Sequence, residues 1–214
     1  MSLICPTVLA DTPEKYTQQI KKIDGLGRRV QIDLTDGRFA PAKTISPAEA
    51  WWPAGRLADF HLMFKSPAPA IADVLAHQPN LIIVHAEADF DFEQVYTACR
   101  DHAVKLGMAL LADTGPEVIE NRLNQLDHAL IFSGQLGSYG GHADLSLLDK
   151  VKFLKSKKAD LEVGWDGGIN NLNIAQLVEG GVDVLNVGGF IQGADDPAKA
   201  YTDLARIAEE TGTT

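Results

Sequence analysis

The amino-acid sequence predicts an α/β protein built as a single (β/α)8, or TIM, barrel. Three observations predict it: eight short runs rich in Val, Ile and Leu recur along the 214 residues, segments with helical spacing separate them, and no linker or composition shift divides the chain. A chain of this length has room for one sizeable core and lies near the lower end of what an eight-fold barrel needs. We therefore expect residues 1–214 to form one domain.

The predicted strands are short and mostly continuous apolar runs, as expected for a parallel sheet that is covered on both faces. Because strands alternate with helices, they imply right-handed βαβ units, and seven or eight such units in one short chain close more naturally into a barrel than into an open sheet. The predicted strands are Leu3–Leu9, Val30–Leu34, Leu57–Met63, Leu81–His85, Met108–Leu111, His128–Phe132, Leu161–Trp165 and Val184–Val187.

Helical patterns fill the gaps between these strands. In Pro13–Leu26 the apolar residues Tyr16, Ile20 and Ile23 recur at helix spacing, and Glu117–Leu126 follows a Thr-Gly-Pro start. A Trp-Trp-Pro sequence interrupts the crossover between the second and third strands, so that helix is the least regular. The other predicted helices are Pro67–His77, Phe92–Leu106, Leu145–Lys157, Asn171–Glu179 and Pro197–Glu210.

The composition is that of an ordinary globular protein, with 45% apolar and 22% charged residues. Lysine and arginine total 19 against 29 acidic residues, and the net charge of −10 argues against a surface devoted to nucleic acid or to an anionic membrane. A phosphorylated ligand is still compatible with this charge, because backbone N–H groups at a helix N-terminus can hold a phosphate group whatever the global charge.

The two cysteines, Cys5 and Cys99, lie far apart and in no metal-type spacing, so we predict buried thiols and no disulfide. No basic patch followed by a long apolar run opens the sequence, and no stretch is long and apolar enough to span a membrane. We therefore expect a soluble, cytoplasmic protein.

Polar residues interrupt the apolar strands near their ends, and in a barrel of this kind these ends and the following loops form the site. Asp33, His61 and Asp166 belong to the second, third and seventh strands or follow them directly. A carboxylate in a buried strand is costly unless it is paired or liganded, so we predict a functional role for these three residues. His85 and Glu87 end the fourth strand, and we expect them to satisfy each other or nearby backbone groups.

Three glycine-rich stretches, Gly137–Gly141, Gly167–Gly168 and Gly188–Gly189, occupy the last loops. Glycine lets a backbone approach an anion closely and adopt positive φ. The loops after the seventh and eighth strands are the usual phosphate site of a barrel. We therefore predict that the protein binds a small phosphorylated sugar, or a close analogue, at the C-terminal ends of its strands.

Taken in chain order, these pieces resemble the ribulose-phosphate 3-epimerase family from Cys5 to about Gly193. The resemblance implies a barrel of the ribulose-phosphate-binding type. The matching motifs are Pro6-Thr7-Val8-Leu9, Asp33-Leu34-Thr35-Asp36-Gly37-Arg38-Phe39, Asp59-Phe60-His61-Leu62-Met63, Val84-His85-Ala86-Glu87, Gly140-Gly141, Asp166-Gly167-Gly168-Ile169 and Gly188-Gly189.

The resemblance also implies an isomerase of carbohydrate metabolism, of pentose-phosphate type, that epimerises the carbon next to the ketone of a ketose phosphate. One aspartate removes a proton, a divalent metal stabilises the enediolate oxygens, and a second aspartate returns a proton on the opposite face. Carried over by motif, Asp33 and Asp166 are the two catalytic bases, and Asp33, His61 and Asp166 are metal ligands. The implied substrate contacts are Thr7, His61, Ser138, Tyr139, Gly140, Gly141, Gly167, Gly168, Gly188 and Gly189.

One departure from the family concerns the metal. The family has a histidine ligand two residues before the first aspartate, and here that position is Gln31. An amide oxygen is a weaker ligand than imidazole for zinc-like metals, although three protein ligands can still hold an ion. We expect the site to bind its metal weakly, to prefer a harder ion such as Mn²⁺ or Mg²⁺ over Zn²⁺ or Fe²⁺, or to bind none, with Gln31 as a candidate fourth ligand.

Other departures affect the substrate side of the site. Thr35 replaces a family methionine, Gly189 replaces a serine, and residues 134–142, the sixth loop, read Gly-Gln-Leu-Gly-Ser-Tyr-Gly-Gly-His where the family has Asn-Pro-Gly-Phe-Gly-Gly-Gln. Two alternatives to an epimerase therefore stay open: a related phosphosugar lyase or isomerase, and a phosphosugar-binding homologue that has lost turnover. Self-association is also open, since Trp51-Trp52 is compatible with an interface and with buried packing.

Overall fold

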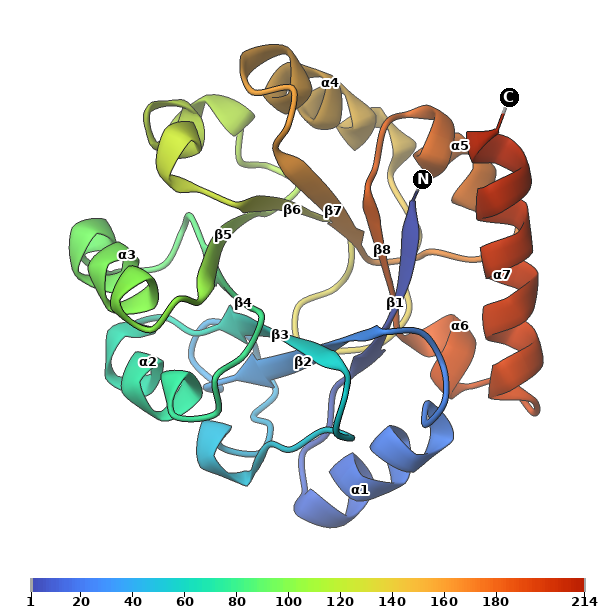
Figure 1. Cartoon of the computed structure of the whole chain (residues 1–214), viewed down its shortest axis with the longest axis horizontal. Helices are drawn as coiled ribbons and strands as arrows, with labels where there is room; N and C mark the ends of the chain where they lie inside the picture. The colour runs from blue at the N-terminus through green and yellow to red at the C-terminus, as the bar shows by residue number, and fades with distance from the viewer. Residues whose placement is uncertain (1, 214) are drawn as a thin grey trace.

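Eight parallel strands form a closed barrel in the computed structural model, which describes residues 2–213. Each strand pairs with the next in the chain, and β8 pairs with β1. The helices lie outside the ring of strands, as Figure 1 shows. The predicted (β/α)8 barrel is confirmed. The single-domain prediction for residues 1–214 extends to Met1 and Thr214, which lie outside the described residues.

All eight predicted strands are present. The boundary between the third helix and the fifth strand was predicted wrongly, because Leu106 belongs to the strand and the helix ends at Asp101. Ala103 adopts the left-handed region, with φ of 55°, and starts the turn between them. The strands are β1 (Leu3–Val8), β2 (Arg29–Thr35), β3 (Leu57–Met63), β4 (Leu81–His85), β5 (Lys105–Leu110), β6 (His128–Phe132), β7 (Glu162–Asp166) and β8 (Val184–Val187).

The helices are more often shorter than their sequence patterns. The crossover from β2 to β3 holds only a three-residue 3-10 turn, and α6 was not predicted. The α-helices are α1 (Pro13–Lys22), α2 (Ala68–Leu75), α3 (Phe92–Asp101), α4 (Leu148–Lys157), α5 (Ile174–Glu179), α6 (Gly189–Gln192) and α7 (Pro197–Gly212), and the 3-10 segments are η1 (Pro47–Glu49), η2 (Pro116–Gln125) and η3 (Leu145–Leu147).

The segment predicted as a helix over Glu117–Leu126 is the 3-10 segment η2. Its buried residues Pro116, Ile119 and Leu123 still form one packed face. The apolar spacing therefore predicted which side is buried but not the tighter hydrogen-bond pattern, because residues three and four apart share a face in both helix types.

Strand β2 alternates instead of running continuously apolar. Val30, Ile32 and Leu34 belong to the large core cluster that also holds the buried faces of the helices. Between them, polar side chains reach across the interior of the barrel: Arg29 contacts Glu162 of β7, and Gln31 contacts Asp166 of the same strand. The expectation of a continuous apolar run was wrong for β2, because its inward face carries the polar centre of the barrel.

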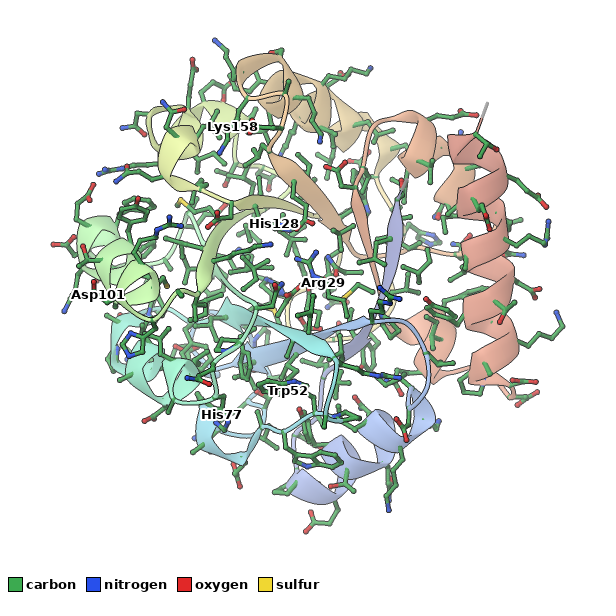
Figure 2. All side chains as sticks on the ribbon, viewed as in Figure 1. Arg29, Trp52, His77, Asp101, His128 and Lys158 are labelled. Atoms are coloured by element: carbon green, nitrogen blue, oxygen red, sulfur yellow. The ribbon has the colours of Figure 1, made fainter. Side chains whose placement is uncertain are left out.

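A salt-bridge cluster fills the N-terminal half of the barrel interior. Arg29 pairs with Asp59 and donates two hydrogen bonds of 2.9 Å to Glu162, while His128 Nδ1 lies 2.8 Å from Glu162 Oε1. Figure 2 shows Arg29 and His128 near the axis of the barrel. This cluster closes the end opposite the predicted site, so its charges are compensated internally.

Several other expectations can be compared with the fold. Cys5 and Cys99 are buried and free, as predicted. Trp51 is 42% exposed, whereas Trp52 packs against the core, so the two indoles do not share one environment. Within residues 2–213, no helix combines the length and apolar character needed to cross a membrane.

Candidate active site

A cavity of about 210 Å³ opens at the C-terminal end of the strands. Strands β1, β2 and β7 contribute to its wall, together with the sixth loop and the turns after β7 and β8. The lining includes eleven of the predicted site residues: Thr7, Asp33, Ser138, Tyr139, Gly140, Gly141, Asp166, Gly167, Gly168, Gly188 and Gly189. The structure thus brings together residues that are as much as 182 positions apart in the sequence (Thr7 and Gly189).

Gln31 and His61 do not belong to this wall. Both side chains are fully buried, at 0% exposure, and both contact Asp33. His61 was expected to contact the substrate, but its position behind Asp33 leaves it no exposed surface. Its contacts instead connect the two aspartates to the interior of the barrel.

The two predicted bases, Asp33 and Asp166, meet through one amide group. Gln31 Nε2 donates a hydrogen bond of 2.8 Å to Asp33 Oδ1 and a second, shorter one to Asp166 Oδ2. Burial, followed by the nearby negative charge of Asp33, raises the pKa of Asp166 to about 7. The pair therefore carries less than two negative charges near neutral pH, as expected when two carboxylates share a dry site.

The donor set at this point fits a divalent cation. His61 Nδ1 lies 2.9 Å from Asp33 Oδ1 and 3.7 Å from Asp166 Oδ2. Asp33, His61 and Asp166 can each offer one ligand atom, and the three atoms lie within 4.8 Å of one another. Ligand atoms about 2 Å from an ion lie at most about 4 Å apart, so only small side-chain movements are needed.

His85 and Glu87 lie close together, as expected, but His85 also reaches the predicted site. Its Nδ1 is 3.4 Å from Glu87 Oε2, and its Nε2 is 2.8 Å from His61 Nε2. Burial lowers the pKa of His85 to about 4, so the ring is neutral at neutral pH. Phe39 packs against the same ring, with centroids 4.7 Å apart. The pair is therefore linked to the aspartates through His61.

The glycine turns after β7 and β8 are covered by the sixth loop. A Cβ on Gly167 would lie 2.1 Å from Gly134 N, and one on Gly168 would lie 2.1 Å from Ala143 N. A Cβ on Gly188 would lie 2.6 Å from the ring of Tyr139. Close packing of the loop is thus a second reason for these glycines, besides the predicted approach of a phosphate group.

Tyr139 fastens the sixth loop to the other side of the cavity. Its hydroxyl accepts a hydrogen bond from Leu9 N at 2.6 Å and donates one to Gln19 Oε1 at 2.7 Å. Gln19 in turn donates to Leu9 O, so the tyrosine, the glutamine and the end of β1 form one network. This network holds the loop over the cavity.

The sequence analysis missed Asn186, which lies in β8 and lines the cavity. It is only 2% exposed, and neither of its amide atoms has a hydrogen-bond partner among the described residues. It stands opposite Asp166 in the β7–β8 register. A polar residue inside Val184-Leu185-Asn186-Val187 is the same signal that identified Asp33, so the pattern was sufficient to find it.

Comparisons with known sequences agree with this arrangement. A sequence profile of the "Ribulose-phosphate 3 epimerase family" matches residues 3–191. The ribulose-phosphate 3-epimerase of Bacillus subtilis is 30% identical over 213 residues, which cover 95% of this chain and 98% of that protein. The enzyme of the same name from Mycobacterium bovis is 31% identical, covering 96% of this chain and 93% of its own.

Solved structures share the fold at low sequence identity. The 3-hexulose-6-phosphate synthase of Salmonella typhimurium superposes with a TM-score of 0.72 at 11% identity, covering 98% of this chain and 99% of that one. The KGPDC of Streptococcus mutans, solved in complex with D-ribose 5-phosphate, gives a TM-score of 0.76 at 12% identity, with 98% of each chain covered.

The family match extends over nearly the whole chain, and the curated relatives carry the epimerase name at about 30% identity. These findings confirm the resemblance read from the motifs and the prediction of an isomerase of the epimerase class. The chain belongs to the ribulose-phosphate 3-epimerase family.

Proposed function

We propose that the protein is an epimerase that inverts the carbon next to the ketone of a ketose phosphate. The observation that carries this proposal is the placement of Asp33 and Asp166, from β2 and β7, on one cavity whose other walls are glycine turns. Epimerisation needs a group that removes a proton on one face of the substrate and a group that returns one on the other face. Two carboxyl groups on one cavity meet that requirement.

The chain's own residues would divide the work as follows. Asp33 and Asp166 move the proton, and the backbone N–H groups of the turns at Gly167–Gly168 and Gly188–Gly189 bind the phosphate group. Thr7 and Asn186 lie in the same wall and are available to the sugar hydroxyls. The sixth loop, held by Tyr139, excludes water from the reacting carbon.

Asp33, His61 and Asp166 are the residues that would hold a divalent cation. Such an ion supplies positive charge where the enediolate forms, which makes the carbon-bound proton acidic enough for a carboxylate to remove. Zn²⁺, Fe²⁺, Mn²⁺ and Mg²⁺ are all compatible with two carboxylates and one imidazole. Gln31 next to this set favours the harder ions, because its amide is a poor ligand for zinc-like metals.

The decisive experiment measures exchange of the carbon-bound proton with solvent. Purified protein supplied with Mn²⁺ is incubated in D₂O with ribulose 5-phosphate, and NMR follows deuterium incorporation at C3 and formation of the epimer. Ketohexose phosphates are then tested in the same way. The proposal is wrong if no ketopentose or ketohexose phosphate exchanges its proton with any of the four metals.

A second candidate is a phosphosugar-binding protein without turnover. The amide of Gln31, bonded to both aspartates, favours it because it occupies the two carboxylates that catalysis requires. Saturable binding of a sugar phosphate, together with the absence of exchange under all metal conditions, would establish this function instead.

A further inference from the structure

The side chain of Gln31 lies where a cation would have to bind. Its Nε2 bonds to Asp33 Oδ1 and Asp166 Oδ2, the same two oxygens that lie nearest to His61 Nδ1. The glutamine is fully buried on strand β2, between the two aspartates and the interior of the barrel. The amide nitrogen and an ion therefore seek the same carboxylate oxygens.

The orientation of this amide follows from the chemistry of its neighbours. A carboxamide offers two N–H donors on one side and an acceptor oxygen on the other. Turned the other way, Gln31 Oε1 would face two carboxylates, which would bring acceptors together without a donor. Gln31 Oε1 has no hydrogen-bond partner among the described residues, and leaving it unsatisfied is costly. The two charge-assisted bonds of Nε2 outweigh that loss.

We propose that the carboxamide of Gln31 is a built-in competitor of the metal ion. It holds Asp33 and Asp166 together in the metal-free protein, and an ion must break both of its hydrogen bonds before it can bind. The protein then has a weak, readily reversible metal site. This inference rests on the proposed function, because the ion belongs to that mechanism.

The opposite role makes the opposite prediction. If Gln31 Oε1 were a ligand, removing the amide would weaken metal binding. If the amide competes, removing it strengthens binding, since two carboxylates without a donor attract a cation more strongly. The sign of the change in affinity thus separates a ligand from a competitor.

The test uses Mn²⁺ alone, without sugar phosphate, and isothermal titration calorimetry on the full chain. In Gln31→Met the side chain keeps nearly the same shape but loses both donors, and its thioether is a poor ligand for a hard ion. We expect Mn²⁺ to bind this variant at least about tenfold more tightly than the wild type, from the loss of one or more charge-assisted bonds. Gln31→Leu is expected to act in the same direction if the methionine variant does not fold.

Gln192→Met is the matched control. Gln192 is also buried, but its Nε2 donates to the carbonyl oxygen of Thr7 at 3.0 Å instead of to a carboxylate. Its substitution should leave Mn²⁺ affinity unchanged. Weaker or unchanged Mn²⁺ binding in the Gln31 variants overturns the proposal, as does the absence of binding in both wild type and variants.

A second measurement needs no substitution. In protein labelled with ¹⁵N-glutamine, the Gln31 NH₂ protons should be shifted by their two carboxylate acceptors, and saturating Zn²⁺ should remove that shift. An unchanged resonance in the ion-bound protein overturns the proposal. If Mn²⁺ binds the variant but not the wild type, the competitor role holds even though a metal-dependent function of the wild type fails.

Discussion

The imidazole rings of His61 and His85 meet at their Nε2 atoms, which lie 2.8 Å apart in the interior of the barrel. Burial keeps His85 neutral at neutral pH, and its Nδ1 faces Glu87 Oε2 at 3.4 Å. A proton on that Nδ1 leaves the His85 Nε2 as an acceptor for His61. His61 then carries its proton on Nε2 and presents the Nδ1 lone pair to the two aspartates, which is the tautomer that binds metal.

Replacing His85 should therefore weaken metal binding without direct contact to the ion. We expect His85→Leu to lower Mn²⁺ affinity about tenfold to a hundredfold, which is typical for loss of a partner that orients a histidine ligand. Calorimetry measures the affinity, and ¹⁵N NMR of the ring reports the tautomer of His61. The exposed His102 provides the control His102→Leu. Unchanged affinity and tautomer in His85→Leu would reduce His85 to a packing residue.

Asp33→Asn should separate catalysis from binding. Asparagine keeps the shape of the side chain but cannot accept a proton, so turnover should fall by about a hundredfold or more. Affinity for a sugar phosphate should change little, because the glycine turns are untouched. Asp24→Asn, at a carboxylate that is 68% exposed, serves as the control. An equal loss of binding and turnover would mean that Asp33 holds the structure of the cavity.

Tyr139→Phe should loosen the sixth loop. The ring would still pack on Gly188, but the bonds to Leu9 and Gln19 would be lost. One neutral hydrogen bond is worth about 1 kcal/mol, so we expect roughly a fivefold higher KM for the phosphorylated substrate. Limited proteolysis should cut the loop faster, whereas Tyr96→Phe on helix α3 should change neither measurement. Wild-type KM and cleavage in Tyr139→Phe would contradict this role.

Gly167→Ala tests whether the loop rests on the turn after β7. The turn has φ of 113°, and the new methyl group would strike Gly134 N. Gly25→Ala is the matched control, since its φ is 81° and nothing lies within 4 Å of the added carbon. Both variants should lose about 1–2 kcal/mol from the positive φ. Gly167→Ala should lose about 1–3 kcal/mol more from overpacking, measured by urea denaturation. Equal losses would show that the loop yields freely.

The Arg29 cluster should make the fold sensitive to acid. The two strongest influences on Glu162 oppose each other: burial raises its pKa, whereas its hydrogen bonds to His128 and Arg29 lower it, leaving it below the ordinary value of 4.5. A carboxylate with a lowered folded pKa stabilises the protein above its unfolded pKa and loses that contribution as pH falls through the folded value. We expect the free energy of unfolding to fall steadily below about pH 5.

Glu162→Gln identifies the source of this dependence. The variant should be less stable by about 1–2 kcal/mol at pH 7, a moderate figure because the glutamate side chain is 34% exposed. The difference from wild type should shrink toward pH 3, where the glutamate itself becomes protonated. Urea denaturation at both pH values measures it. A pH-independent difference would assign the loss to packing alone.

The strands and most of the site could be predicted because both rest on local signals. Apolar runs marked the strands, and a carboxylate inside such a run marked Asp33. The bond from Gln31 to Asp166 joins residues 135 positions apart across the barrel, and no spacing in the sequence specifies which inward side chains meet. The same holds for the contact of His61 with His85. The turn at Ala103 carries no glycine or proline, so the end of α3 had no local marker.

The sequence also assigned one role to the glycine pairs where the structure offers two. Anion binding was inferred from the absence of a side chain, which is a property that close backbone packing requires equally. Only the positions of Gly134 and Ala143 above Gly167 and Gly168 distinguish the two uses. Cellular location and self-association stay predictions.

The packing of the sixth loop on the turns after β7 and β8 has a kinetic consequence. A phosphate group seated on those turns lies beneath the loop that covers them, so the group cannot leave while the loop is down. Departure of the product and opening of the cover become a single event. We therefore expect the chemical step to be faster than the overall cycle, and the cycle to slow in viscous solvents.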